Sequence, residues 1–103
     1  MKVYRQGDVI IKPATLPNEL KEKKDNVLAE GAVSGHSHRI KPEHKSNAKL
    51  FVTPQGLMFI HIKEPTHIVH EEHEDIILPV GEYEVLVQRE YNWFNEEVRR
   101  VAD

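Results

Sequence analysis

The sequence contains no cysteine, which removes several kinds of protein from consideration. Without thiols there is no disulfide framework, no thiolate-bound zinc and no cysteine nucleophile. No apolar run approaches the ~18 residues of a membrane-spanning helix, and the beginning, MKVYRQGDVI, lacks the basic-then-apolar pattern of a signal peptide. We therefore expect a soluble, cytoplasmic protein with no membrane partner.

Neither sign of charge dominates the chain. The formal net charge is −3 with neutral histidines, which argues against a broad attraction to nucleic acid. Mild acid could reverse that sign, because seven histidines titrate near an unperturbed pKa of about 6.5. Glycine-rich phosphate loops, the G-x-S-x-G elbow and the dinucleotide fingerprint are also missing. The common nucleotide-binding and serine-hydrolase motifs are therefore excluded.

The length of 103 residues predicts a single domain, residues 1–103, because domains commonly contain about 100–150 residues. The apolar fraction is 39% and the charged fraction is 30%, so the core is lean and the exterior well solvated. Since association would compensate for a lean core, we expect a homo-oligomer, most simply a homodimer.

Short runs of Val, Ile, Phe and Tyr, bounded by Gly or Pro, predict strands and turns rather than long helices. The clearest hairpin is 49–64, where TPQG joins KLFV to LMFIHIKE. Residues 82–91 alternate as a strand does, and residues 17–25 and 41–48 read as loops. Further strands are predicted at 3–6, 8–12, 27–30 and 36–40 and within THIVH and DIILP.

Seven or eight short strands favour an all-β fold, a small antiparallel β-barrel or sandwich. We expect at most one short helix. The tail, residues 92–103, is compatible with a short helix over EEVRRVA or with a final edge strand.

Five of the seven histidines lie in two tight groups, G-H-S-H-R at 35–39 and T-H-I-V-H-E-E-H-E-D at 66–75. On a strand, His36 and His38 share one face with Cα atoms about 6.5–7 Å apart, so both imidazoles can reach one cation. The β-branched residues after Pro65 favour extended structure up to His70, and the acid-rich EEHED favours a turn that holds His73. A neighbouring acid could serve as a ligand or orient an imidazole.

The sequence thus predicts a divalent-metal site made of His36, His38, His70 and His73, with His67 as a further candidate outside this set. Nitrogen and carboxylate donors without thiolate suit zinc, iron, manganese or nickel. The metal would either stabilise a small domain or, with an open coordination position, activate water for hydrolysis. Whether the protein is an enzyme is left open. His44 is expected to be solvent-exposed, and His61 is expected to be an ordinary strand residue.

Two alternatives use the same histidines without a metal. In the first, the domain is a non-enzymatic interaction or assembly module whose surface histidines respond to pH. In the second, paired histidines act as general base and general acid on a phosphodiester, with Arg39 and Lys41 holding the phosphate.

Two resemblances arise from these motifs. G-A-V-S-G-H-S-H-R-I-K-P-E and the later P-V-G resemble the two cupin motifs, which implies a small β-barrel with His36, His38 and Glu43 as metal ligands. The chain departs from the cupin pattern at Glu84, which stands where the second motif has its ligand. Over nearly the full length, Y-R-Q-G-D-V, G-H-S-H-R, H-E-E-H and Q-R-E-Y are similar to a group of small uncharacterised proteins of bacteria and phages. That resemblance implies no activity.

Overall fold

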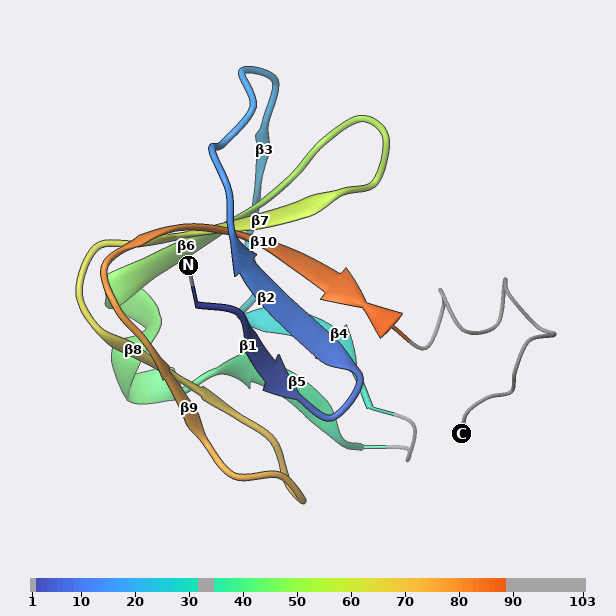
Figure 1. Cartoon of the computed structure of the whole chain (residues 1–103), viewed down its shortest axis with the longest axis vertical. Coiled ribbons are helices and arrows are strands. Elements are labelled where there is room, and N and C mark those ends of the chain that lie inside the picture. The colour runs from blue at the N-terminus through green and yellow to red at the C-terminus, as the bar shows by residue number, and fades with distance from the viewer. Residues whose placement is uncertain (1, 32–34, 89–103) are drawn as a thin grey trace, which may run out of the picture.

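A computed structural model describes residues 2–31 and 35–88. In this part of the chain, ten strands form two antiparallel sheets (Figure 1). The first sheet has the order β1-β2-β10-β7-β6-β3, and the second has the order β4-β5-β8-β9. The strands are β1 (Tyr4–Gln6), β2 (Val9–Pro13), β3 (Lys21–Lys23), β4 (Val27–Glu30), β5 (Ser37–Ile40), β6 (Ala48–Val52), β7 (Met58–Ile62), β8 (Thr66–Val69), β9 (Ile76–Leu78) and β10 (Gly81–Val87).

The core lies between the two sheets, because alternate residues of the strands of both sheets point inward. Val9 and Ile11 of β2, Ile60 of β7, and Ile68 and Leu78 of the second sheet are each 0% exposed and belong to one hydrophobic cluster. Full burial of such a side chain contributes about 1.5–3 kcal/mol. This cluster holds the sheets face to face.

Strand β10 connects distant parts of the chain. It pairs with β2 on one side, where Val85 lies opposite Ile11, and with β7 on the other, where Tyr83 lies opposite Ile60. The β1–β2 hairpin is therefore part of the first sheet, and its turn lies near β5 of the second sheet (Figure 1), where Gln6 contacts His38.

The all-β prediction is confirmed, in its two-sheet form. The sheets do not close into a barrel within the described residues, so the barrel alternative is wrong. The hairpin of 49–64 is confirmed as β6 and β7, with a turn in which the Gly56 N–H donates to the Thr53 carbonyl.

Three details differ from the expectations. Residues 17–25, read as a loop, include β3, which pairs with β6. Residues 41–48 contain the 3-10 helix η1 (Pro42–Asn47), which proline begins. The described residues contain ten strands, against the seven or eight that were expected, and β3 is the strand that matches no predicted segment. The tail prediction for 92–103 lies outside the described residues.

No helix in the described residues is long and apolar enough to cross a membrane.

Candidate metal centre

Three segments meet at one end of the two sheets. They are the β1–β2 turn, the start of β5 and the turn between β8 and β9. Gln6, the last residue of β1, donates hydrogen bonds to the carbonyls of Ile68 on β8 and Glu74 in the turn. The Ser37 N–H at the start of β5 donates to Glu71 in the same turn. These bonds connect segments that lie far apart in the sequence.

The first histidine pair follows strand geometry. His38 and Ile40 of β5 point inward and are buried, whereas Ser37 and Arg39 are only half-buried. His38 is 1% exposed, and His36, two residues earlier, is half-buried. The spacing of two therefore sends both imidazoles toward the same region.

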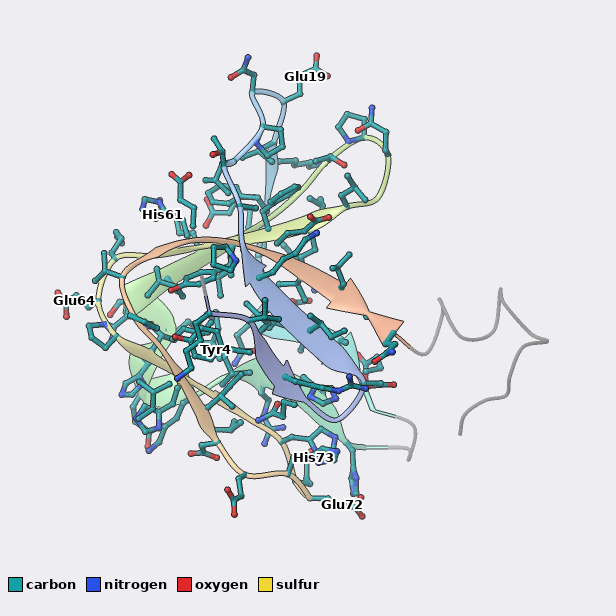
Figure 2. The ribbon with its side chains drawn as sticks, in the orientation of Figure 1. Tyr4, Glu19, His61, Glu64, Glu72 and His73 are labelled. Atoms are coloured by element: carbon teal, nitrogen blue, oxygen red, sulfur yellow. The ribbon has the colours of Figure 1, made fainter. Side chains whose placement is uncertain are left out.

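The second pair follows the predicted strand end. Strand β8 stops at Val69, so His70 is the first residue beyond it and His73 lies in the turn. In Figure 2, His73 and its neighbour Glu72 project at the end of the molecule opposite Glu19. The prediction that extended structure ends near His70 is confirmed.

The structure brings the four predicted histidines together. The ring of His70 lies 5.6 Å from that of His36, 4.3 Å from that of His38 and 4.6 Å from that of His73, measured between ring centroids. The rings of His38 and His73 are stacked with centroids 5.9 Å apart. The two sequence groups therefore form one cluster, which we call the histidine cluster. The metal-binding role of each member stays a prediction.

His67 is directed elsewhere. Its backbone N–H donates to Nδ1 of His44 over 3.0 Å, the two rings lie 4.9 Å apart, and its Nδ1 is 3.5 Å from a carboxylate oxygen of Asp75. The expectation that His44 is a solvent-exposed loop residue is wrong, because this contact half-buries it against β8. His61 lies on β7 opposite Glu82 and Lys49, as expected of a strand residue.

Within the described residues, one trio places ligand atoms of all three members within 4.8 Å of one another, namely His36, His70 and Glu71. The Nδ1 atom of His36 is buried and has no hydrogen-bond partner among these residues. Its ion-pair neighbour, a carboxylate oxygen of Glu72, is 3.9 Å away. Buried polar atoms are nearly always hydrogen-bonded. This imidazole nitrogen therefore has a binding capacity that the described residues leave unused.

Both carboxylate oxygens of Glu71 already have partners on β5. Its Oε1 accepts a hydrogen bond from the Ser37 N–H at 3.0 Å, and its Oε2 lies 3.1 Å from Nη1 of Arg39. The hydrogen bond from Ser37, reinforced by Arg39, lowers the pKa of Glu71 to about 2. This carboxylate stays ionised at neutral pH and attaches the turn to β5.

Two features of His70 favour its neutral form. Burial, with the neighbouring His73, lowers its pKa, and its Nδ1 accepts the Glu72 N–H at 3.0 Å. A neutral imidazole that accepts at one nitrogen carries its proton on the other. Binding of a cation to either nitrogen of His70 therefore requires this proton, or the Glu72 hydrogen bond, to be displaced.

Sequence reasoning missed three residues at this end, Gln6, Gly7 and Asp8. The oxygen Oε1 of Gln6 is 2.8 Å from Nδ1 of His38, and Oδ1 of Asp8 is 3.5 Å from Nε2 of the same ring. A Cβ on Gly7, where φ is +60°, would lie 2.6 Å from Nε2 of His73. The only signal in the sequence was Q-G-D itself, a polar turn with a glycine, and no spacing rule connects it to histidines that lie thirty or more residues away.

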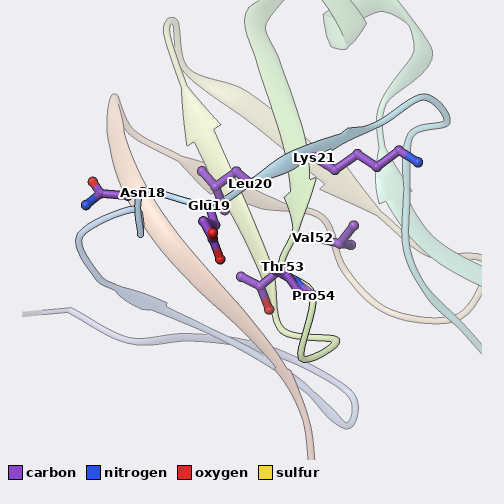
Figure 3. Close-up of a pocket in the computed structure, with 7 residues that line it drawn as sticks. All are labelled: Asn18, Glu19, Leu20, Lys21, Val52, Thr53 and Pro54. Carbon is purple, nitrogen blue, oxygen red and sulfur yellow. The ribbon is translucent and has the colours of Figure 1, made fainter.

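A separate groove of about 440 Å³ lies beside β3 and the end of β6 (Figure 3). It is lined by Asn18, Glu19, Leu20, Lys21, Val52, Thr53 and Pro54. No histidine lines it, so it is not part of the histidine cluster.

The ligand set that the cupin resemblance implied, with Glu43 beside His36 and His38, is not supported. Glu43 lies exposed in η1, and Glu84 lies on β10, where its carboxylate is 3.9 Å from Nζ of Lys12. Neither belongs to the trio of His36, His70 and Glu71.

Comparison with known proteins places the chain in a family. Residues 5–88 match the family described as a domain of unknown function, DUF8820, and the chain belongs to it. This agrees with the resemblance to an uncharacterised group. No curated protein matches the chain significantly, and no solved structure does so.

Proposed function

We propose that this domain binds a divalent transition-metal ion through His36, His38, His70 and His73. The observation that carries the proposal is the gathering of four imidazole rings from two separate segments, with ring centroids 4.3–5.9 Å apart. Protonated rings at such distances would repel one another, whereas neutral rings are the form that ligates a metal. The buried Nδ1 of His36, which has no hydrogen-bond partner within the described residues, supports the same proposal, because coordination would satisfy it.

The types of ligand atom in the cluster limit which metal ions suit it. Imidazole nitrogen with carboxylate oxygen, and no thiolate, suits zinc, iron(II), manganese or nickel. A bound ion would stabilise the fold by mass action. If one coordination position holds water, hydrolysis by metal-activated water is the simplest chemistry available.

The experiment is elemental analysis of untagged protein, because a histidine tag would mimic the result. Wild type is expected to hold near-stoichiometric metal. The double variants His36→Ala/His38→Ala and His70→Ala/His73→Ala are each expected to lose it, since each removes half of the cluster. The matched control is His44→Ala/His61→Ala, which also removes two histidines but leaves the cluster intact.

The proposal fails if wild type carries no metal and takes up none of zinc, manganese, nickel or iron(II). It also fails if the control loses metal as completely as the two cluster variants. Thermal unfolding of every metal-free variant separates loss of ligands from loss of fold.

Three further expectations accompany this proposal. We infer one domain, because both sheets contribute to one hydrophobic cluster. The homodimer and the cytoplasmic location stay predictions from the sequence. Light scattering coupled to size-exclusion chromatography tests the homodimer, because a dimer has twice the monomer mass of 12.0 kDa.

A further inference from the structure

The buried side chain of Gln6 determines which nitrogen of His38 carries a proton. The amide nitrogen of Gln6 donates to two carbonyls, that of Ile68 at 3.0 Å and that of Glu74 at 2.9 Å. The two N–H groups are thus used, and Oε1, which can only accept, faces Nδ1 of His38 at 2.8 Å. Nδ1 must therefore be the donor. When His38 is neutral, its lone pair is at Nε2.

Nε2 of His38 faces a carboxylate. Oδ1 of Asp8 is 3.5 Å away, with the His38 side chain 2% exposed and that of Asp8 30% exposed. A lone pair and a carboxylate oxygen repel at this distance unless a proton or a cation lies between them. Bonds of about 2.0–2.2 Å to zinc at a tetrahedral angle separate two ligand atoms by about 3.3–3.5 Å. The observed separation matches that of two ligands on one ion.

We propose that Asp8 and His38 bind the cation as a pair and that Gln6 is the positioning residue that prepares His38 for it. This rests on the proposed function, to which it adds a carboxylate ligand and an orienting amide from the β1–β2 turn. A ligating imidazole commonly donates its other N–H to a fixed oxygen, and loss of such an acceptor costs about 10–100-fold in metal affinity. Gln6 supplies that oxygen here.

His38 and His70 differ in their readiness for a cation. His70 must lose the hydrogen bond from the Glu72 N–H, or its proton, before it can ligate. Ligation through Nε2 leaves the hydrogen bond between His38 and Gln6 in place, because that bond is made by the other ring nitrogen, Nδ1.

The competing explanation is a proton between the two groups, which makes an imidazolium–aspartate ion pair. Both explanations fit a distance of 3.5 Å. They differ in the state of Nε2 of His38 when metal is present. Nitrogen-15 NMR of the histidine rings distinguishes a metal-bound nitrogen from a protonated one.

The test is zinc titration calorimetry on untagged full-length protein, with nitrogen-15 NMR of the zinc-loaded form. Asp8→Asn removes the charged ligand, and Gln6→Met removes the orienting amide. Gln6→Glu keeps an acceptor for Nδ1 of His38. The matched control is Asp25→Asn, since Asp25 accepts from Lys23 and the Val27 N–H rather than facing a histidine.

We expect Asp8→Asn and Gln6→Met to weaken zinc binding by about tenfold or more, Gln6→Glu to recover part of the loss, and Asp25→Asn to match wild type. Zinc-loaded wild type should show Nδ1–H and a metal-bound Nε2 on His38, and Gln6→Met should lose this signature. A merely structural role of Gln6 would alter the melting temperature without changing the ring state.

Two results overturn the proposal while leaving metal binding intact. One is wild-type zinc affinity in Asp8→Asn, and the other is a proton retained on Nε2 of His38 in the zinc-loaded protein. Zinc binding absent from wild type overturns the proposed function as well. If Gln6→Met does not fold, Asp8→Asn still decides, because its side chain is partly exposed in a turn.

Discussion

At the residue scale, the histidine cluster combines contacts within one segment with contacts between distant segments, since Oε1 of Gln6 on β1 is 2.8 Å from Nδ1 of His38 on β5. The i, i+2 spacing of His36 and His38 needs only strand geometry, and the change from Ile-Val to acids after His70 needs only propensity. Asp8 and Gln6 reach the cluster through a turn about thirty residues away in sequence. No pattern within one sequence encodes that contact, because the pairing of β1 with β2 and of β2 with β10 creates it.

Gly7 offers a test of how closely the β1–β2 turn approaches the cluster. An added Cβ would lie 2.6 Å from Nε2 of His73, and φ is +60°. We expect Gly7→Ala to lose roughly 1–2 kcal/mol of unfolding free energy from the left-handed backbone conformation. It should also weaken zinc binding, because the ring of His73 must move. Chemical denaturation and calorimetry measure the two effects.

Gly56→Ala is the matched control for this substitution. Gly56 has φ +90°, and a Cβ there would meet nothing within 4 Å. The backbone strain is therefore retained without the contact to a histidine. Gly56→Ala should lose stability but keep wild-type zinc affinity. Equal zinc affinity in both alanine variants would show that the position of His73 does not matter for binding.

At the scale of elements, strands with alternating or branched residues were predictable, and short elements of polar residues were not. β4 and the β6–β7 hairpin appear where the sequence placed them. The strand β3 consists of Lys-Glu-Lys, which has low strand propensity. It is extended because it pairs along β6, a tertiary contact that overrides local preference. Likewise, η1 has no buried residue, so its sequence carries no apolar periodicity from which a helix could be predicted.

The turn between β8 and β9 is attached to β5 through Glu71, and this attachment should depend on pH. The pKa of Glu71 is lowered from 4.5 to about 2, first by the Ser37 N–H and further by Arg39. A lowered carboxyl pKa stabilises the folded state above pH 4.5, and the contribution is lost as the pH falls toward 2. Glu71→Gln should therefore be less stable than wild type at neutral pH, with a difference that shrinks below pH 4.5.

Denaturant unfolding of both proteins from pH 7 down to pH 3 measures this difference. Glu72→Gln is the matched control, because its carboxylate is 62% exposed and 3.9 Å from His36, too far for a strong hydrogen bond. It should follow the wild-type curve within about 0.5 kcal/mol, as exposed substitutions usually do. A pH-independent deficit in Glu71→Gln would mean that packing, and not the charge of Glu71, attaches the turn.

At the scale of the whole molecule, composition and strand count predicted the all-β class, but they could not predict the order of the strands in the sheets. Both β2 and β7 pair with β10, and such distant pairings have no local signal. The same topology places the β1–β2 turn against the turn after β8, joined by the bonds of Gln6. The histidine cluster is thus a product of the global fold, and it should form only when both sheets are packed.

If the cluster forms only in the folded state, a cation that binds it must stabilise the entire fold. At a free zinc concentration 100 times Kd, linkage contributes about 2.7 kcal/mol. For a domain of this size each kcal/mol shifts Tm by about 4–8 °C, so we expect a rise of roughly 10–20 °C. Magnesium, which requires octahedral oxygen ligands, should leave Tm unchanged. The variant lacking His36, His38, His70 and His73 should show no zinc response. If zinc does not raise the Tm of wild type, or raises the Tm of the variant that lacks these four histidines equally, then any zinc binding occurs outside the cluster.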